Sequence, residues 1–401
     1  MSRILLLENP HAVADEVFTA YGHEVVRYKG ALDEDELIEA LEDIDVLGLR
    51  SKTMVTERVL RARPGLQAMG AFCIGTNQIN LTTAASMGIP VFNAPYSNTR
   101  SVVELALAEI ISLTRRLTPL NDALHAGVWD KTADGAHEVR GRTLGIVGYG
   151  NIGAQLGILA EAIGMKVIYF DVVEKLALGN ARPMPTMDDL LAEADIVSVH
   201  ISGSAGTEAI FGDREFAAMK DGAIFINLSR GHFVDYDALH RALDNGKLSG
   251  AAADVYPEEP KKNGDPFEFP LRGYDNVILT PHIGGSTEEA QHDIGRFVAS
   301  KLTDYLRSAS TDMCVNLPQL TLPMGRPGRH RVAYVHRNTP GVLALINQAF
   351  AEAGANIEGQ ILGTLGEIGY VITDIASELP VEAIAALKEM EQTLRLRVVA
   401  I

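Results

Sequence analysis

The feature that most constrains the fold is a glycine-rich turn between an apolar run and a helix-forming segment. Gly148-Tyr149-Gly150-Asn151-Ile152-Gly153 follows the apolar run LGIV and opens the segment NIGAQLGILAEAI. In such a turn the first glycine permits the sharp bend, the second lets a pyrophosphate approach the backbone, and the following helix N-terminus binds phosphate. The pattern therefore predicts a dinucleotide-binding βαβ unit within a parallel, doubly wound sheet.

The acidic residue that completes this pattern is Asp171. It follows the next apolar run, KVIYF, and lies about 20 residues beyond the turn, as the pattern requires. A carboxylate there hydrogen-bonds the ribose 2′-hydroxyl of NAD and disfavours the extra 2′-phosphate of NADP. The alternative is a glycine-rich turn followed by a solvated aspartate. The combined order of strand, turn, helix and acid favours an NAD site.

Short apolar runs alternate with helix-forming segments in two series along the chain. The first series holds ILLL, VLGL and IPVF within residues 1–97, and the second holds LGIVG, KVIYF, DIVSVH, AIFINL, GAAADV and NVILT within residues 143–280. A long apolar helix is expected from Ser101 to Leu117. Such alternation predicts βαβ units and therefore two domains built on parallel sheets.

The C-terminal part of the chain has a different pattern. Residues 308–329 include Pro318, Pro323 and Pro327, and this composition predicts an inter-domain linker. Residues 330–401 follow the order βαββαβ, which is the ferredoxin-like arrangement. The predicted fold class is therefore α/β, with two doubly wound parallel-sheet domains and a C-terminal ferredoxin-like domain.

Composition excludes several classes of partner. The chain of 401 residues has 35 Lys and Arg against 52 Asp and Glu, a formal net charge of −17. Nucleic acids and anionic membranes bind proteins through basic faces. Because this chain is strongly acidic, neither is expected as its partner. The two cysteines, Cys73 and Cys314, form no CxxC, so we expect neither a disulfide nor a metal site. The start of the chain lacks a signal-peptide pattern and no segment suits a membrane span, which predicts a cytoplasmic protein.

Three residues of complementary chemistry each follow a predicted strand of the second series. Arg230 lies in NLSRG, Glu259 in DVYPEEP and His282 in TPHIGGST. Ligands of open α/β sheets bind beyond the carboxyl ends of the strands, so these side chains are expected at one edge of the sheet. Each one alone would more often be a surface or turn residue. Their joint position beside a nucleotide turn favours a catalytic role.

The expected roles follow from the chemistry of alcohol oxidation. Removing a hydride from an alcohol also releases the hydroxyl proton. A histidine titrates near neutral pH, so His282 can accept and hold that proton. A carboxylate on the other ring nitrogen, from Glu259, fixes the tautomer and stabilises the imidazolium. The guanidinium of Arg230 grips a substrate carboxylate and polarises the carbonyl.

The motifs GYGNIG with Asp171, NLSRG, DVYPEEP and TPHIGGST together resemble those of the D-isomer-specific 2-hydroxyacid dehydrogenases. The stretches LRSKT, FCIGTNQ, VFNAPYSNTRSVVE and GVWDK narrow the resemblance to the branch that oxidises 3-phospho-D-glycerate and carries a C-terminal ACT domain. The resemblance implies a discontinuous substrate domain (1–97 with 285–308), an NAD-binding domain (98–284), a linker (309–329) and an ACT regulatory domain (330–401). It also implies NAD-dependent formation of 3-phosphohydroxypyruvate, the first step of L-serine biosynthesis.

The resemblance also assigns ligand contacts. Ile74 and Gly75 match backbone amides near the substrate carboxylate, and Arg50 matches a phosphate-side arginine, with Ser51 and Asn98 nearby. The alternative for Arg50 is an exposed strand-end arginine. The expected cofactor-binding residues are Gly148, Gly150, Asn151, Ile152, Gly153, Asp171, Leu228, Ser229, Arg230, Asp254, His282, Ile283, Gly284 and Gly285.

Two further assignments concern assembly and regulation. Trp129 matches a residue that reaches a neighbouring subunit, with core packing as the alternative. In HRNTPG, Thr339 and Pro340 suit a helix start, which would explain that segment without a ligand. His336 and Asn338, with Asn356, resemble the L-serine-binding residues of ACT domains. The resemblance thus implies a homotetramer, assembled through NAD-domain and ACT-domain contacts, that L-serine inhibits.

Two other functions remain open from the sequence. The first is a dehydrogenase for another D-2-hydroxy acid, or a side reduction of 2-oxoglutarate to 2-hydroxyglutarate, because a dicarboxylate resembles a phospho-acid in charge and length. The second is a non-catalytic NAD-sensing protein, which the presence of Arg230, Glu259 and His282 disfavours.

Overall fold

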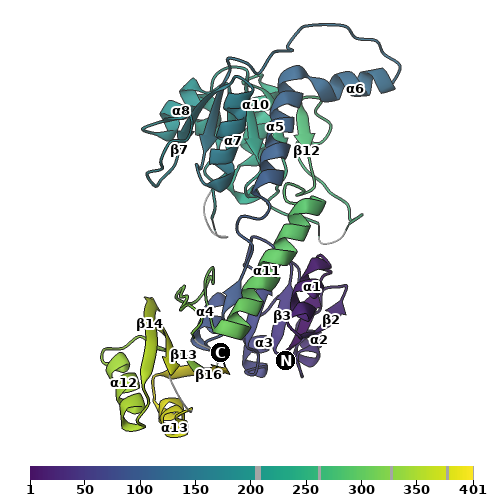
Figure 1. Cartoon of the computed structure of the whole chain (residues 1–401). Coiled ribbons are helices and arrows are strands. Elements are labelled where there is room, and N and C mark those ends of the chain that lie inside the picture. The colour runs from purple at the N-terminus through teal and green to yellow at the C-terminus, as the bar shows by residue number, and fades with distance from the viewer. Residues whose placement is uncertain (204–208, 261–262, 326–327, 376–378, 401) are drawn as a thin grey trace. The chain divides into compact units, whose positions relative to one another are not determined.

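The computed structural model describes residues 1–203, 209–260, 263–325, 328–375 and 379–400. The chain divides into two compact units, Met1–Ser97 with Gln291–Ile401, and Asn98–Ala290. The first unit contains a parallel sheet and an antiparallel sheet, and the second contains one parallel sheet (Figure 1). These sheets confirm the predicted fold class.

The parallel sheet of the first unit has the strand order β2-β1-β3-β4-β5. Alternate residues of β1 face opposite sides, as the two-residue period of a strand requires. Ile4 and Leu6 pack in a cluster with Val298 and Leu302 of α11, whereas Leu5 and Leu7 belong to the cluster on the opposite face. The elements are β1 (Arg3–Leu7), α1 (Val13–Ala20), β2 (Glu24–Tyr28), α2 (Glu34–Ala40), β3 (Val46–Leu49), α3 (Glu57–Ala62), β4 (Ala68–Ala71), α4 (Leu81–Ser86), β5 (Val91–Phe92) and α11 (Glu288–Ser308).

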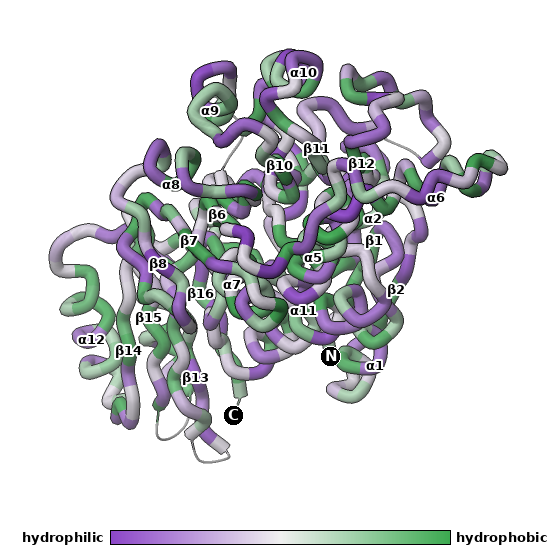
Figure 2. The backbone as a smooth tube through the Cα atoms, turned by 90° about the horizontal axis from the view of Figure 1, so that it is seen from above, coloured by the Kyte–Doolittle hydropathy of each residue, from purple (hydrophilic) through white to green (hydrophobic). Residues whose placement is uncertain are grey.

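The sheet of the second unit has the order β12-β11-β10-β9-β6-β7-β8. The chain runs outward from β6 through β7 and β8, then returns to the other side of β6 with β9, so the order reverses between β6 and β9. Figure 2 shows hydrophobic residues along much of β6, β7 and β10, which are buried on both faces. The strands are β6 (Thr143–Val147), β7 (Lys166–Phe170), β8 (Arg182–Pro183), β9 (Ile196–Val199), β10 (Ala223–Asn227), β11 (Leu248–Ala253) and β12 (Val277–Leu279). The helices are α5 (Thr99–Arg115), α6 (Leu117–His125), α7 (Asn151–Ala162), α8 (Met187–Glu193), α9 (Asp213–Ala218), the 3-10 turn η1 (Gly231–Phe233) and α10 (Tyr236–Asp244).

The C-terminal antiparallel sheet has the order β14-β15-β13-β16 and the predicted βαββαβ sequence of elements. These are β13 (His330–Arg337), α12 (Val342–Glu352), β14 (Ile357–Leu365), β15 (Ile368–Ile375), α13 (Val381–Glu389) and β16 (Thr393–Ala400). The expected helix cap at Thr339 is wrong, because α12 begins at Val342 after Gly341, whose φ is +88°. Thr339 and Pro340 therefore lie in the connection before the helix.

The segment predicted as a linker packs against the first unit over much of its length. Thr311, Cys314 and Leu317 are buried, and Cys314 forms an antiparallel bridge with Phe92 of β5. Asn316 accepts a hydrogen bond from the Val91 amide at 2.8 Å. Residues 326–327 of this segment lie outside the described residues.

Arginines of the C-terminal sheet attach it to the rest of the first unit. Arg331 is fully buried, forms a two-bond ion pair with Asp374 (2.7 and 2.8 Å) and also donates to the Leu322 carbonyl. Arg395 donates to the carbonyl oxygens of Leu66 and other residues that precede β4 and β5. Backbone carbonyls thus supply many of the partners that these cations need in a buried interface.

Candidate active site

The glycine-rich turn joins β6 to α7 at the point where the strand order of the second unit reverses. Gly148 has a φ of +95°, and a Cβ there would lie 2.6 Å from the His200 carbonyl oxygen. A Cβ on Gly153 would clash with the Gly148 carbonyl oxygen. Around Gly150, by contrast, the space that a Cβ would enter is open, and no side chain caps the first turn of α7. Open space beside uncapped helix amides fits the pyrophosphate of a dinucleotide.

Asp171 lies directly after β7 and beside this turn. One carboxylate oxygen accepts a hydrogen bond from the Tyr149 amide at 2.9 Å, and the other accepts from the Val173 amide at 3.0 Å. The carboxylate is therefore held at the mouth of the turn, only partly buried. This is where an acceptor for the ribose hydroxyls of NAD is required.

The predicted catalytic pair is in hydrogen-bonding contact. The Nδ1 atom of His282 lies 2.9 Å from Oε2 and 3.0 Å from Oε1 of Glu259. This hydrogen bond raises the pKa of His282 above its ordinary value, although burial opposes the change. Burial acts to raise the pKa of Glu259, but the hydrogen bond and charge of His282 outweigh it, so the Glu259 pKa is lowered. The pair therefore favours a protonated imidazole beside an ionised carboxylate.

The backbone that presents His282 is held by Asp254, which follows β11. Its Oδ1 accepts from the Thr280 hydroxyl at 2.6 Å and the Ile283 amide at 2.8 Å, and its Oδ2 accepts from the Gly284 amide at 2.8 Å. His282 itself has a φ of +54°, a conformation that is uncommon outside glycine. Asp254 thus stabilises a turn that the chain would otherwise adopt at a cost in free energy.

Arg230 follows β10, the neighbour of β11 in the sheet. Its Nη1 donates to the Ser229 carbonyl at 2.7 Å, and Asn227 accepts from the Ser229 amide and donates to the Arg230 carbonyl. The charge of Arg230 acts to lower the pKa of both Glu259 and His282. The structure therefore brings Arg230, Glu259 and His282 together at the carboxyl edge of three adjacent strands.

The predicted cofactor residues on these strand ends share the same edge. Leu228 and Ser229 are buried, and Ile283 is exposed. Asn98 packs against Gly285, where a Cβ would clash with the Asn98 amide. Asn151 is exposed and Ile152 is half-buried at the start of α7.

The other predicted substrate residues belong to the first unit. Arg50 and Ser51 follow β3, and Ile74 and Gly75 follow the neighbouring strand β4, so all four lie at the carboxyl edge of that sheet. The Arg50 guanidinium is half-buried and has no hydrogen-bond or ion-pair partner among the described residues. An unpartnered cation at a strand end is available for an anionic ligand.

The predicted effector residues lie at the end of β13 and after α12. His336 is buried, and a Cβ on Gly369 of the adjacent strand would clash with its ring. Its Nδ1 donates to the Arg337 carbonyl at 2.8 Å, whereas its Nε2 is buried without a partner in the described part of the chain. Asn338 is exposed and donates to the Gly366 carbonyl at 3.1 Å, and Asn356 is exposed.

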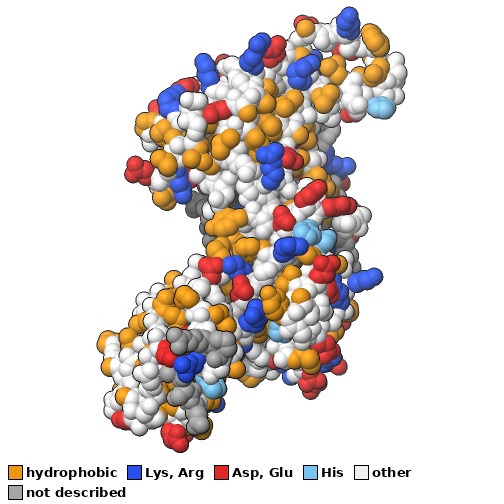
Figure 3. Space-filling model, in the orientation of Figure 1, with side chains coloured by type: hydrophobic (Ala, Val, Ile, Leu, Met, Phe, Trp, Pro, Cys, Tyr) orange, Lys and Arg blue, Asp and Glu red, His pale blue; other side chains and the backbone are white. Residues whose placement is uncertain are grey.

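Trp129 is 79% exposed, so the core-packing alternative is wrong for the isolated chain. It follows α6, which extends with its loop away from the rest of the second unit (Figure 1). Exposed apolar residues gather there, and Figure 3 shows hydrophobic side chains along this projection. They are Leu117, Leu124 and Val128.

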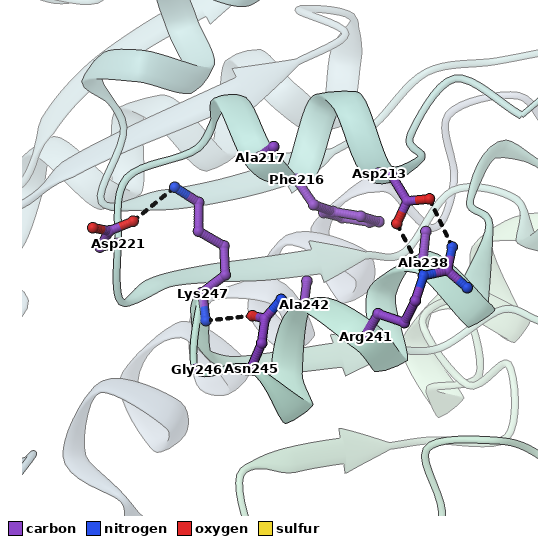
Figure 4. A pocket seen from close by; sticks show the side chains of 10 residues that line it. All are labelled: Asp213, Phe216, Ala217, Asp221, Ala238, Arg241, Ala242, Asn245, Gly246 and Lys247. Atoms are coloured by element: carbon purple, nitrogen blue, oxygen red, sulfur yellow. Dashed lines mark hydrogen bonds and ion pairs between the residues drawn. The ribbon is translucent and has the colours of Figure 1, made fainter.

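A surface pocket between α9 and α10 lies apart from this edge (Figure 4). Asp221 and Lys247, which line it, precede β10 and β11, so the pocket lies at the amino edge of the sheet. The cations that line it are already paired: Lys247 with Asp221 at 2.7 Å and Arg241 with Asp213 at 2.8 Å. We assign no catalytic role to it.

Two acidic residues with unusual surroundings were not predicted as site residues. Glu109 of α5 is buried near Asp254. It lies on the apolar face of the helix with Val102, Val103, Ala106 and Ile110, and this position in the sequence already indicates a buried carboxylate. Glu8, at the end of β1, binds the backbone after Arg50. No local pattern marks Glu8.

Comparisons with known proteins identify relatives of this chain. The model of the D-isomer specific 2-hydroxyacid dehydrogenase NAD-binding domain matches residues 107–284, and the model of the AHAS small subunit-like ACT domain matches residues 332–395. D-3-phosphoglycerate dehydrogenase of Haemophilus influenzae is 48% identical over 397 residues, which cover 99% of this chain and 97% of the relative. The Escherichia coli K12 protein of the same name is 48% identical over 398 residues, with 98% and 97% covered.

Solved structures show the same fold in most of the chain. D-2-hydroxyisocaproate dehydrogenase superposes with a TM-score of 0.70 at 25% identity, covering 78% of this chain and 99% of that one. D-lactate dehydrogenase of Aquifex aeolicus, solved with NAD and lactic acid, gives a TM-score of 0.65 at 27% identity, covering 75% and 95%. In the described residues, no helix combines the length and apolar character needed to cross a membrane.

Proposed function

The chain belongs to the D-isomer-specific 2-hydroxyacid dehydrogenase family, and from that premise we propose that it is an NAD-dependent D-3-phosphoglycerate dehydrogenase. The reaction is oxidation of 3-phospho-D-glycerate to 3-phosphohydroxypyruvate, the first step of L-serine biosynthesis. The observation that carries the proposal is the His282–Glu259 pair, 2.9 Å apart, on the sheet edge that also bears the glycine-rich turn. The 48% identity to named D-3-phosphoglycerate dehydrogenases supports the choice of substrate.

The residues of the second unit supply binding and proton transfer. NAD, bound at Gly148–Gly153 and Asp171, supplies the hydride acceptor. The Glu259 carboxylate accepts a hydrogen bond from Nδ1–H of His282. In the neutral imidazole this leaves the lone pair on Nε2, which takes the proton of the substrate hydroxyl. Arg230 binds the substrate carboxylate and polarises the carbonyl that forms.

The phosphate of the substrate is assigned to the first unit. Arg50 offers a guanidinium without a partner in the described chain, and Ser51 adds an exposed hydroxyl beside it. At the end of the next strand, the backbone amides of Ile74 and Gly75 are assigned to the substrate carboxylate rather than to the phosphate. A guanidinium that can bind two phosphate oxygens at once gives this position both affinity and orientation.

Regulation is assigned to the ACT domain. The buried, unpartnered Nε2 of His336 and the exposed amides of Asn338 and Asn356 provide groups that bind the carboxylate and ammonium of L-serine. We also propose a homotetramer assembled through the NAD-binding and ACT domains, and the exposed apolar residues around Trp129 support the contact through the NAD-binding domain. We also propose that the enzyme acts in the cytoplasm.

The test is NADH consumption by the purified protein with 3-phosphohydroxypyruvate, with and without millimolar L-serine. We expect turnover that serine suppresses. Higher turnover with 2-oxoglutarate, measured side by side, would instead favour a 2-hydroxyglutarate dehydrogenase. If no 2-keto acid is reduced while NADH still binds, the protein is an NAD sensor and the catalytic proposal fails.

A further inference from the structure

We infer that Glu8 is a positioning residue for the phosphate end of the substrate, which it serves by holding the loop that carries Arg50. The inference rests on the proposed function and deepens it. Glu8 does not face the substrate itself. It acts through the backbone of residues 51–53, the three residues that follow Arg50.

The Glu8 carboxylate occupies a nest of three consecutive backbone amides. Its Oε2 accepts from the Ser51 amide at 2.9 Å and the Lys52 amide at 3.0 Å, and its Oε1 accepts from the Thr53 amide at 2.7 Å. Successive amides that point inward in this way form a site for an anion. In this protein the anion is built into the chain, because the carboxylate is almost fully buried.

The backbone at Glu8 adopts an uncommon conformation to reach this nest. Glu8 and the next residue, Asn9, have φ angles of +65° and +55°, and neither is glycine. The left-handed conformation is unfavourable for any residue that carries a Cβ atom. The Glu8 amide donates to the Tyr28 carbonyl at 3.0 Å, which helps to hold the turn. A conformation of this kind persists only where surrounding contacts compensate for it.

Arg50 is also held from its other side. Its carbonyl oxygen accepts a hydrogen bond from Gln78 Nε2, and Gln78 is buried. The carbonyl before the nest and the three amides after it are thus all engaged, while the guanidinium has no partner among the described residues. The backbone of Arg50 is therefore held in place, while its guanidinium is available to bind a phosphate. A cation on a fixed backbone can orient the phosphate that it binds.

The occupied nest also restricts where a phosphate can bind. Because Glu8 already uses the amides of residues 51–53, this loop can bind a substrate phosphate only through its side chains, which are the Arg50 guanidinium, the Ser51 hydroxyl and the exposed Lys52 ammonium. Removing the Glu8 charge would release the loop from its fixed position. The freed amides of residues 51–53 would then compete with the Arg50 guanidinium for the phosphate and draw it away from the position that suits catalysis. Recognition of the phosphate would then weaken, whereas recognition of the keto acid would not change.

The test compares Glu8→Gln with the intact enzyme on two substrates that differ only in the phosphate, 3-phosphohydroxypyruvate and hydroxypyruvate. We expect the variant to raise KM for the phosphorylated substrate by about 10-fold or more, the loss typical of hydrogen bonds to a charged group. KM for hydroxypyruvate and both kcat values should stay within twofold. The matched control is Glu36→Gln, which weakens a carboxylate–amide bond (to Asp33, 3.0 Å) in the same unit and should change neither KM.

An equal rise in both KM values, or no change in either, would overturn the inference. Should Glu8→Gln fail to fold, hydrogen exchange in the intact enzyme gives an independent answer. The amides of residues 51–53 should exchange slowly, and inorganic phosphate should not slow them further, because Glu8 occupies them. Protection of these amides by phosphate would contradict the inference. Lack of turnover by the intact enzyme would instead overturn the proposed function, and the exchange result would remain interpretable.

Discussion

The replacement of Glu109 by glutamine should remove a pH dependence of stability that the intact protein shows. Glu109 lies on the buried face of α5 and is 2% exposed, and neither carboxylate oxygen has a hydrogen-bond partner in the described residues. Burial, and then the charge of Asp254, raise the pKa of Glu109 from its ordinary 4.5 to about 8. The folded protein therefore holds this proton at neutral pH, whereas the unfolded chain has released it.

The magnitude follows from the two pKa values. Between pH 4.5 and 8 the folded state binds more protons than the unfolded state, so the free energy of unfolding decreases as the pH rises through this window. The slope approaches about 1.4 kcal/mol per pH unit in the middle of this window. The free energy of unfolding therefore decreases by about 3 kcal/mol between pH 5 and pH 7.5. The glutamine side chain has nearly the same shape and does not titrate. The stability of Glu109→Gln relative to the intact protein should therefore rise by about 3 kcal/mol over this interval.

Urea unfolding followed by circular dichroism at pH 5, 6.25 and 7.5 measures this difference, at one protomer concentration and without NAD. Other titrating groups affect both proteins alike and cancel in the comparison. Glu104→Gln is the control, because Glu104 is an exposed acid on the same helix, paired with Arg100. The difference in the free energy of unfolding between Glu104→Gln and the intact protein should not change with pH. If the Glu109→Gln difference is equally flat, Glu109 is ionised when folded and our account of its burial is refuted.

Four further predictions concern catalysis, cofactor choice and regulation. His282→Ala should lower kcat by about 10²–10⁴-fold while NADH still binds in a fluorescence titration, and near-normal turnover would exclude His282 as the proton carrier. Glu259→Gln removes the contact that raises the pKa of His282, so the acidic limb of the pH profile for oxidation should move to lower pH; an unmoved limb would mean that this contact does not control the titration. Asp171→Ala should weaken NAD binding and reduce the preference for NAD over NADP, and an unchanged ratio of kcat/KM values for the two cofactors would place the ribose contact elsewhere. Asn338→Ala should abolish inhibition by L-serine with turnover nearly unchanged, whereas full inhibition of the variant would move the effector site away from Asn338.

Some elements escaped the sequence patterns for identifiable reasons. The strand β4, with the sequence AMGA, has no β-branched or aromatic residue, yet it pairs on both sides within the sheet. Its strand conformation comes from its neighbours rather than from its own propensity. The linker prediction followed the prolines, which do prevent regular structure, but the burial of Cys314 and Leu317 depends on an apolar surface beside β5 that composition cannot show.

The sequence by itself determined the features that depend on residues close together in the chain. The glycine spacing of the turn, the acid at the end of the next strand and the positions of Arg230, Glu259 and His282 after apolar runs all act over a few residues. For parallel strands, the end of the run already decides the edge of the sheet. The contact between Glu259 and His282, 23 residues apart, was predicted from their chemistry, and the pairing of β11 with β12 supplies its geometry.

The tertiary structure alone decided the roles of Glu8 and Glu109. Glu8 lies 43 to 45 residues from the amides it binds, and it reaches them because β1 pairs with β3 rather than only with β2. Glu109 acquires its raised pKa because α5 packs where Asp254 follows β11. Strand order and helix packing result from the burial of whole apolar faces, a property of the complete domain. A carboxylate in a nest and a carboxylate without a partner therefore look alike in the sequence, and only the fold separates them.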